Sequence, residues 1–317
     1  MNIVILDAAS LGSDMDLSVF SELGSCRIWQ NTEPHELEQR IRDCHIIITN
    51  RVILGEKELS FAPSLRMIAL TATGFNTIDL ERCRQRDIAV ANVTSYSTGS
   101  VAQHTFAMLL YLLEQTRYYD DYVRQGKFRE DRRFADVSRP WYEISGKRWG
   151  IIGLGTIGRK VATLAEAFGA EVVYFSTSGV DRVEAFRSVS LDELCRSSDI
   201  ISIHAPLNQQ TCGLLGETEF NMMKKSSLLI NAGRGAIVNE KALSEALSAG
   251  SIRGAALDVL CDEPPSEDNP LLPLIGEKLL ITPHNAWGSI ESRSRLINEV
   301  FENIKAFQKD EKRNRIL

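Results

Sequence analysis

The sequence lacks the features that mark membrane proteins and nucleic-acid-binding proteins. No apolar run reaches the roughly 18 residues that a membrane-spanning helix needs. Basic residues are not in excess, since 36 Lys and Arg stand against 42 Asp and Glu, a net charge of −6. A mildly acidic chain has no electrostatic footprint for nucleic acid or an anionic membrane. We therefore expect neither as a partner.

Paired cysteines and a basic N-terminal region are also lacking. The six cysteines form no CxxC motif, and none lies at metal-ligand spacing from a histidine. We expect no metal site, and buried, reduced thiols in a cytoplasmic protein. The first residues, MNIVILDAAS, are typical of a first strand and not of a signal peptide. The cysteines are Cys26, Cys44, Cys83, Cys195, Cys212 and Cys261.

Apolar runs alternate with helical patterns along the whole chain. At 317 residues, the chain has room for about two domains of roughly 150 residues each. The alternation predicts an α/β fold with two doubly wound parallel sheets and crossover helices. In the first third, strands are expected at 3–6, 46–49, 67–70 and 88–91. From Lys147 onward, they are expected at 149–152, 172–175, 200–203, 227–231, 255–259 and 279–282.

The middle of the chain breaks this alternation. Residues 101–113 predict a long apolar helix, and a polar, aromatic stretch follows from Arg117 to Trp141. One interpretation is a surface loop with one helix. The other is an arm that contacts a second copy of the chain.

A glycine motif follows the first strand of the second half. Gly153, Gly155 and Gly158 form GxGxxG between a strand and a helix, the context in which this motif indicates dinucleotide binding. The first glycine permits the turn, the second lets a pyrophosphate approach, and the third lets the helix pack on the strand. The amides of Thr156 and Ile157 then lie at a helix N-terminus, which favours an anion.

The next strand does not end in the acid that usually binds the adenine ribose. Ser176 stands there, and a hydroxyl accepts either a ribose hydroxyl or a 2′-phosphate. Arg182 is near enough in sequence to contact such a phosphate. We therefore expect NAD or NADP as cofactor, with NADPH used at least as well as NADH. The alternative is that Ser176 only weakens NAD binding.

Several polar side chains of the second half fall just beyond the ends of predicted strands. Ligands bind beyond the carboxyl ends of strands in open parallel sheets. We therefore expect these side chains to meet in one site. They are His204, Arg234, Asp258, Glu263 and His284.

These residue types suit the reduction of a ketone beside a nicotinamide. Hydride delivery to the carbonyl carbon creates an alkoxide that needs a proton, and His284 is the candidate donor. Glu263 is the candidate carboxylate that favours the protonated imidazole. Arg234 can hold the carboxylate of a 2-oxo acid and polarise its carbonyl. The small residues Ala232 and Gly233 let the chain approach a ligand.

The other polar residues have less specific expectations. Asp258 can accept a hydrogen bond from the nicotinamide carboxamide. For His204, His35, His45 and His104, core or surface roles are expected. In the first third, residues 71–76 follow an apolar strand, and their small residues and glycine can form a backbone-amide cradle for an anion.

Taken together, these segments resemble the D-isomer-specific 2-hydroxyacid dehydrogenases over nearly the whole chain. In that family an Arg, the Glu of an xEPP segment and a later His form the catalytic relay, which implies Arg234, Glu263 and His284 here. The resemblance places the substrate carboxylate on the amides of Ala72, Thr73 and Gly74. The matching segments are TATGFNTIDL, SVAQHTFAMLL, GKRWGIIGLGTIG, SLLINAGRGAIV, GAALDV, DEPP and ITPHNAW. The implied cofactor contacts are Thr73, Thr105, Thr156, Ile157, Ala205, Ala232, Arg234, Asp258 and His284.

The resemblance also implies a domain organisation. A flavodoxin-like substrate domain is expected at residues 1–99 plus 288–317, and a Rossmann cofactor domain at 100–287. The family is usually a homodimer built by an arm, which would lie near residues 105–145.

Within the family, HNAW and the segment around SVAQHTFAMLL are most similar to bacterial glycerate dehydrogenases, also called hydroxypyruvate reductases. This implies reduction of hydroxypyruvate or glyoxylate to D-glycerate or glycolate. Trp287 would narrow the substrate pocket, unless it only packs at a domain interface. The alternatives are a dehydrogenase for D-lactate or a longer 2-oxo acid, and a nucleotide-sensing protein like the corepressors that share the fold.

Overall fold

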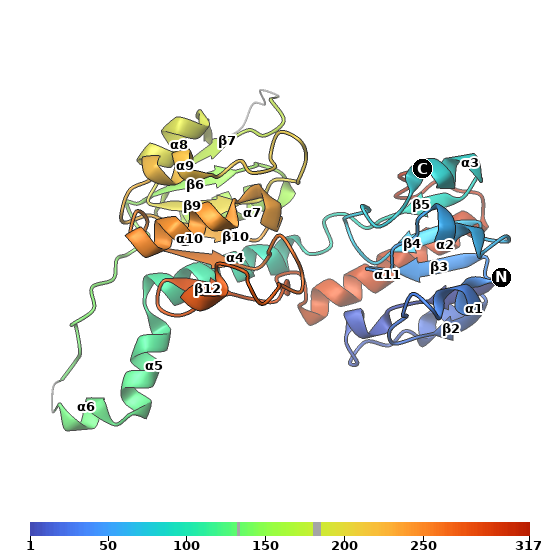
Figure 1. Ribbon diagram of the computed structural model, residues 1–317, viewed down its shortest axis with the longest axis horizontal. Coiled ribbons are helices and arrows are strands. Elements are labelled where there is room, and N and C mark those ends of the chain that lie inside the picture. The colour runs from blue at the N-terminus through green and yellow to red at the C-terminus, as the bar shows by residue number, and fades with distance from the viewer. Residues whose placement is uncertain (132–133, 180–184) are drawn as a thin grey trace. The chain divides into compact units, whose positions relative to one another are not determined.

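The computed structural model describes residues 1–131, 134–179 and 185–317 (Figure 1). The chain divides into two compact units. Unit 1 comprises Met1–Ser97 and Gly288–Leu317, and unit 2 comprises Thr98–Trp287. Each unit is an α/β structure with one parallel sheet.

Unit 1 contains a five-stranded parallel sheet in the order β2-β1-β3-β4-β5. The four strands predicted in the first third are confirmed. The strand β2 was not predicted, because its sequence SCRI is partly exposed and has no continuous apolar run. The strands are β1 (Asn2–Ile5), β2 (Ser25–Ile28), β3 (Ile46–Thr49), β4 (Met67–Leu70) and β5 (Ala89–Ala91).

The last part of the chain completes unit 1. The helix α11 (Ile290–Gln308) packs against β4, and the amide of Ile316 donates to the carbonyl oxygen of Val90 at 2.8 Å. Ile316 and Leu317 thereby pack on the core of buried Ile, Leu and Val side chains. The other helical segments are the 3-10 turns η1 (Ala8–Leu11) and η2 (Ser18–Glu22), α1 (Leu37–Ile41), α2 (Glu56–Ser60) and α3 (Leu80–Gln85).

Unit 2 contains a seven-stranded parallel sheet in the order β12-β11-β10-β9-β6-β7-β8. The chain starts at β6, adds β7 and β8 on one side, and then returns to add β9 to β12 on the other. All six predicted strands are confirmed, and β8, of two residues, was missed. The strands are β6 (Arg148–Ile152), β7 (Glu171–Phe175), β8 (Arg187–Ser188), β9 (Ile200–Ile203), β10 (Leu228–Asn231), β11 (Gly254–Leu257) and β12 (Leu279–Ile281).

Local sequence signals set the helix ends of unit 2. The Oγ of Ser190 accepts the amide of Glu193, and the side chain of Asn239 accepts the amide of Ala242, as expected of N-caps. Gly250 ends a helix in the left-handed region at φ +69°. The helical segments are α4 (Thr98–Leu113), α5 (Thr116–Arg124), α6 (Lys127–Glu130), α7 (Thr156–Ala167), α8 (Leu191–Ser197), α9 (Glu217–Met222), η3 (Gly235–Ile237), α10 (Glu240–Ala249) and η4 (Leu272–Leu274).

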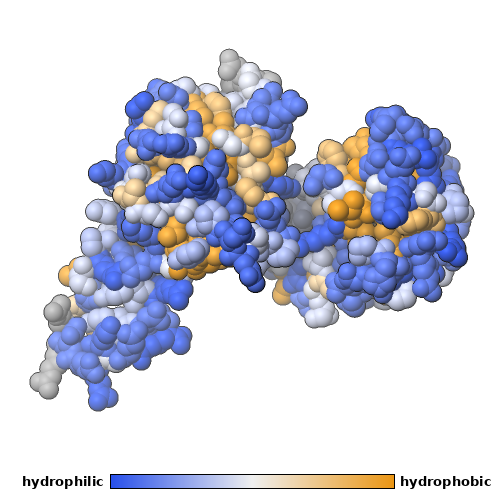
Figure 2. Space-filling view, viewed as in Figure 1, coloured by the Kyte–Doolittle hydropathy of each residue, from blue (hydrophilic) through white to orange (hydrophobic). Residues whose placement is uncertain are grey.

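The helices α5 and α6 project away from the sheet of unit 2 (Figure 1). On the face drawn in Figure 2, this projecting segment presents mostly hydrophilic side chains. We call α5, α6 and the chain that follows them to residue 142 the arm.

The expectation that all the cysteines are buried is wrong. Cys44, Cys83 and Cys195 are buried, but Cys212 and Cys261 are exposed and Cys26 is half-buried. The exposed two lie in loops, whereas the buried three pack among apolar side chains. In the described part of the chain, every helix is too short or too polar to cross a lipid bilayer.

Candidate active site

The glycine loop after β6 is shaped by close contacts. Gly153 has φ +89°, and a Cβ there would lie 2.8 Å from the backbone of Ala205. A Cβ at Gly158 would lie 2.2 Å from the carbonyl oxygen of Gly153. Gly155 is different, because a Cβ there would meet nothing within 4 Å. The first and third glycines are therefore required by packing, and the second faces open space.

This open space lies at the N-terminus of α7. Gly155 caps the helix without a side-chain hydrogen bond, and the amides of Thr156 and Ile157 donate to no described acceptor. Unpaired amides and the helix dipole favour an anion there. The residues present thus fit the pyrophosphate of a dinucleotide.

The position expected to distinguish NAD from NADP carries no acid. Ser176 directly follows β7, is half-buried, and has its Oγ 3.3 Å from that of Ser178. The suggested phosphate partner Arg182 lies outside the described residues.

The loop after β10 presents Arg234. The buried side chain of Asn231 accepts the amide of Gly233 at 3.0 Å and donates to the carbonyl oxygen of Arg234 at 3.0 Å. A Cβ at Gly235 would lie 2.0 Å from the backbone carbonyl carbon of Leu260. The Arg234 loop therefore packs directly on the segment that leads to Glu263.

Glu263 and His284 form a hydrogen-bonded pair, and they come from the loops after β11 and β12. The Nδ1 of His284 lies 2.6 Å from the Oε2 of Glu263, and Oε1 accepts the amide of Leu260 at 3.0 Å. The carboxylate is thus fixed on one side and binds the imidazole on the other. Because Nδ1 faces the carboxylate, it carries a hydrogen, and Nε2 is left to exchange a proton with a ligand.

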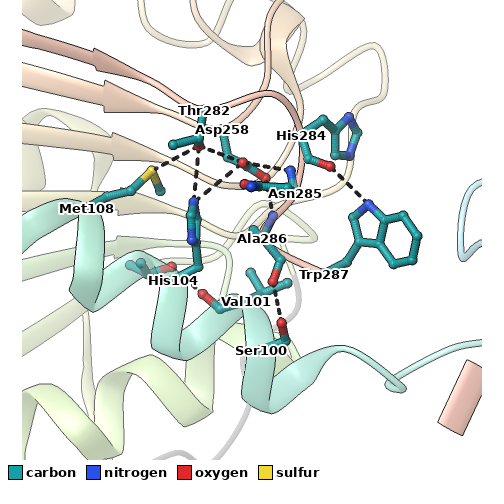
Figure 3. Close-up of polar contacts among 11 residues, drawn as sticks. Ser100, Val101, His104, Met108, Asp258, Thr282, His284, Asn285, Ala286 and Trp287 are labelled. Carbon is teal, nitrogen blue, oxygen red and sulfur yellow. Dashed lines mark hydrogen bonds and ion pairs between the residues drawn. The ribbon is translucent and has the colours of Figure 1, made fainter. Parts of the chain in front are cut away.

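Asp258 holds the backbone of the loop that carries His284 (Figure 3). Its carboxylate accepts the amides of Asn285 and Ala286, both at 2.9 Å, and its carbonyl oxygen accepts the amide of His284 at 2.9 Å. His284 is held in the left-handed region at φ +52°, which is strained for a residue with a Cβ. Several contacts therefore fix the loop in a conformation that it would not adopt alone.

The carboxylate of Asp258 is almost completely buried. Burial raises the pKa of Asp258, but the neighbouring His104 and the hydrogen bonds from Thr282 and the loop amides outweigh this effect and bring the pKa below its ordinary value. The carboxylate stays charged, and its described contacts serve the loop. The expected contact with a nicotinamide carboxamide remains a prediction.

Two further bonds close this loop. The indole Nε1 of Trp287 donates to the carbonyl oxygen of His284 at 2.9 Å, and the hydroxyl of Ser100 donates to that of Ala286 at 2.6 Å. The side chain of Trp287 thus helps to hold the backbone of His284 in place.

His204 follows β9 and is a neutral side chain. Its Nε2 lies 3.1 Å from the Oγ of Ser202, which accepts the indole N–H of Trp149 at 2.9 Å. Its Nδ1 is buried and has no hydrogen-bond partner among the described residues. Burial lowers the pKa of His204 to about 3.

The remaining expected cofactor contacts of unit 2 differ in exposure. Ala205 and Gly233 are buried, while Ala232 is half-buried. Thr105 is completely buried, and its hydroxyl donates to the carbonyl oxygen of Val101 at 2.8 Å. It therefore offers a ligand no exposed atom.

In unit 1, the carbonyl groups of the loop after β4 face the segment that follows β5. The carbonyl oxygen of Ala72 accepts the amide of Val93 at 3.0 Å, and that of Thr73 accepts the side-chain amide of Asn92 at 2.7 Å. The amides of Ala72, Thr73 and Gly74 donate to no described acceptor. Three successive unpaired amides can hold a carboxylate.

The sequence analysis missed the parts played by His104, Thr282 and Asn231. Ser100, His104 and Met108 recur every four residues and so share one face of α4, the face that meets the Asp258 loop in Figure 3. The polar residues Ser100 and His104, four positions apart in a largely apolar helix, could have indicated that this face contacts other polar groups. Within the described ranges, no group of three or more His, Cys, Asp or Glu side chains is arranged to hold a metal ion.

Comparison with known proteins gives consistent matches. The profile of the family described as "D-isomer specific 2-hydroxyacid dehydrogenase, NAD binding domain" matches residues 106–286. A hydroxypyruvate reductase from Blautia hydrogenotrophica is 33% identical over 98% of this chain and 97% of its own length. A glycerate dehydrogenase from Methylorubrum extorquens is 33% identical over 96% of this chain and 95% of its own. Among solved structures, an acyclic imino acid reductase in complex with NADPH and D-arginine has a TM-score of 0.88 and 29% identity, with complete coverage of both chains.

Proposed function

Because the chain belongs to the D-isomer-specific 2-hydroxyacid dehydrogenase family, it is an NAD(P)-dependent oxidoreductase acting on CH–OH groups, and we propose that it reduces hydroxypyruvate or glyoxylate. The products would be D-glycerate and glycolate. The hydroxypyruvate reductase and glycerate dehydrogenase names of two relatives that match nearly full length support this substrate class.

One observation carries the proposal, namely the His284–Glu263 pair beside the Arg234 loop. Bound reduced nicotinamide supplies a hydride. His284 gives the proton from Nε2 to the substrate oxygen, and Glu263 stabilises the protonated imidazole through Nδ1. Arg234 binds the substrate carboxylate and polarises the carbonyl.

The cofactor is proposed to lie along the glycine loop and the neighbouring strand ends. Its pyrophosphate would bind the amides of Thr156 and Ile157. The absence of an acid at Ser176 supports use of NADPH at least as well as NADH. The ratio of kcat/KM for the two cofactors tests this preference, and a strong preference for NADH would overturn it.

Replacing the proton donor tests the catalytic assignment. We expect His284→Ala to lower kcat by roughly 10²–10⁴-fold, the usual contribution of a general acid. NADPH should still bind, because the glycine loop is unchanged. Steady-state rates and a fluorescence titration measure the two effects, and near-normal turnover would refute the role of His284.

Initial rates on a panel of 2-oxo acids test the substrate. Hydroxypyruvate and glyoxylate should give the highest kcat/KM, followed by pyruvate and longer acids. If pyruvate or longer 2-oxo acids gave the higher kcat/KM, this proposal would be wrong. The chain would then be a D-lactate dehydrogenase or an enzyme for longer 2-oxo acids.

We propose further that the amides of Ala72, Thr73 and Gly74 hold the substrate carboxylate. Asn92 fixes this loop through the carbonyl oxygen of Thr73. Asn92→Ala should therefore raise KM for the 2-oxo acid about tenfold, while kcat changes less, because ordered amides are lost from binding. Asn50→Ala, at the end of the neighbouring strand, is the control. Unchanged KM in Asn92→Ala would exclude this role.

A homodimer built by the arm is also proposed. Apolar side chains lie exposed along it, among them Phe134, which is 99% exposed, and Val137. Such side chains suit burial against a second copy. Light scattering should give the mass of a dimer, and Phe134→Ser with Val137→Ser should give a monomer. The six free thiols support a cytoplasmic location.

A further inference from the structure

His104 lies on α4 beside Thr282 and Asp258, close to the loop that carries His284 (Figure 3). It comes from the middle of α4, and its Nε2 is 3.1 Å from the Oγ1 of Thr282 and 3.5 Å from Oδ1 of Asp258. Thr282 in turn lies 2.6 Å from the same Oδ1. The three side chains thus meet at one point, where Asp258 is buried and His104 and Thr282 are half-buried.

The donors and acceptors of this group can be assigned. The hydroxyl of Thr282 has one hydrogen, and at 2.6 Å it donates that hydrogen to the Asp258 carboxylate. The thioether of Met108, at 3.7 Å, is a much weaker acceptor. The Thr282 oxygen therefore accepts from His104, whose Nε2 carries the hydrogen. The bonds run in one direction, from imidazole to hydroxyl to carboxylate.

The same carboxylate holds the active-site loop by the amides of Asn285 and Ala286. Its orientation thus determines where the backbone of His284 lies. We propose that His104 is a positioning residue for the reaction, which acts through Thr282 and Asp258 to fix the loop that carries His284. This inference rests on the role assigned to His284 under the proposed function.

Kinetics of the enzyme test the inference, with kcat measured at saturating NADPH and the KM for NADPH measured at varied NADPH. His104→Leu removes the donor, and we expect kcat to fall about tenfold, less than the roughly 100-fold that a 1 Å misplacement of a reacting group can cost. KM for NADPH should stay within about twofold, because the glycine loop is untouched. His104→Gln keeps an N–H near the position of Nε2 and should restore kcat to within about threefold of the wild-type value.

A double-mutant cycle distinguishes a chain of bonds from separate packing effects. Thr282→Val should lower kcat about as much as His104→Leu, and the double variant should be no worse than either single one. His35→Leu, a matched change at an exposed histidine, should leave kcat unchanged.

Three results would overturn the inference. They are a wild-type kcat in His104→Leu, a His104→Gln as impaired as His104→Leu, and additive losses in the double variant. If His104→Leu does not fold, His104→Asn replaces it, since its shorter amide does not reach Thr282, and His104→Gln must then exceed it in kcat. The test uses whichever 2-oxo acid the enzyme reduces fastest, so it is independent of whether hydroxypyruvate is the substrate. Full activity in His284→Ala would instead refute the proposed function.

Discussion

The two sheets share a winding scheme but differ in the loop after their first strand. In each unit the first strand lies inside the sheet, and the chain continues to one side before it returns to the other. In such sheets, ligands bind where the direction of winding reverses. At this point unit 1 carries a carboxylate, and unit 2 carries glycines and a helix N-terminus.

In unit 1, Asp7 fills the anion position itself. Its carboxylate accepts the amides of Asn50 at 2.9 Å and Arg51 at 2.7 Å, and the hydroxyl of Thr49 at 3.1 Å. In unit 2, the amides of Thr156 and Ile157 are left for a ligand. The comparison teaches that the same topology can hold its own carboxylate, as in unit 1, or leave amides for an anionic ligand, as in unit 2.

The largest expected effect on cofactor binding comes from giving unit 2 the carboxylate of unit 1. Gly155→Asp fits sterically, because a Cβ there meets nothing within 4 Å and the backbone is extended. The new charge should cap α7 and repel the pyrophosphate, raising the Kd for NADPH about 100-fold or more. Fluorescence titration measures the Kd, and circular dichroism checks the fold.

Gly155→Asn is the matched neutral control. It adds nearly the same volume without the charge, so it should weaken binding less. Equal Kd values for the two variants would show that space, and not charge, distinguishes the two units.

The reverse change removes the internal anion of unit 1. Asp7→Ala leaves two amides and a hydroxyl without their acceptor, and we expect the free energy of unfolding to fall by about 3 kcal/mol. Asp7→Asn, which keeps one oxygen acceptor, should cost less. Urea unfolding measures the loss, and the Kd for NADPH should not change. A stability equal to wild type would mean that the carboxylate does not hold this loop.

The smallest expected effect is a pH dependence of stability that comes from His204. This residue follows β9, the first strand added after the winding of the unit 2 sheet reverses. Its pKa in the folded protein is about 3, below the ordinary value of 6.5, because burial disfavours the charged form. Between these values the unfolded chain binds a proton that the folded chain does not. Stability is therefore lost as pH falls below 6.5, by up to about 1.4 kcal/mol per pH unit.

Replacement of His204 by Asn should remove this dependence. From pH 6.5 to pH 5, the wild type should lose about 2 kcal/mol more than His204→Asn. Urea unfolding at pH 8, 6.5 and 5 provides the comparison. The same slope in both proteins would exclude His204 as the source.

The sequence predicted most of the strands because apolar runs are a local signal. Ile46, Ile47 and Ile48, for example, follow one another directly in the chain. By contrast, β2 is partly exposed and the two-residue β8 is fully exposed, so neither contains an apolar run.

The site was predictable only in part, for a similar reason. Strand ends indicated His284 and Glu263, which the structure brings to 2.6 Å. The bonds of His104 to Thr282 and of Asp7 to Arg51 join residues 178 and 44 positions apart, which no local pattern reveals. Cys212 and Cys261 were misassigned because exposure depends on which loops lie over them.

The hydrogen bond between Ser100 and Ala286 has a mechanical consequence. The chain enters unit 2 at Thr98 and leaves it after Trp287, so this bond joins the two crossing segments almost where they leave the unit. His284 is two residues from that bond. The proposed proton donor therefore lies next to a hydrogen bond that ties the entering and leaving segments of unit 2 together, so a displacement of either segment would be passed to the other.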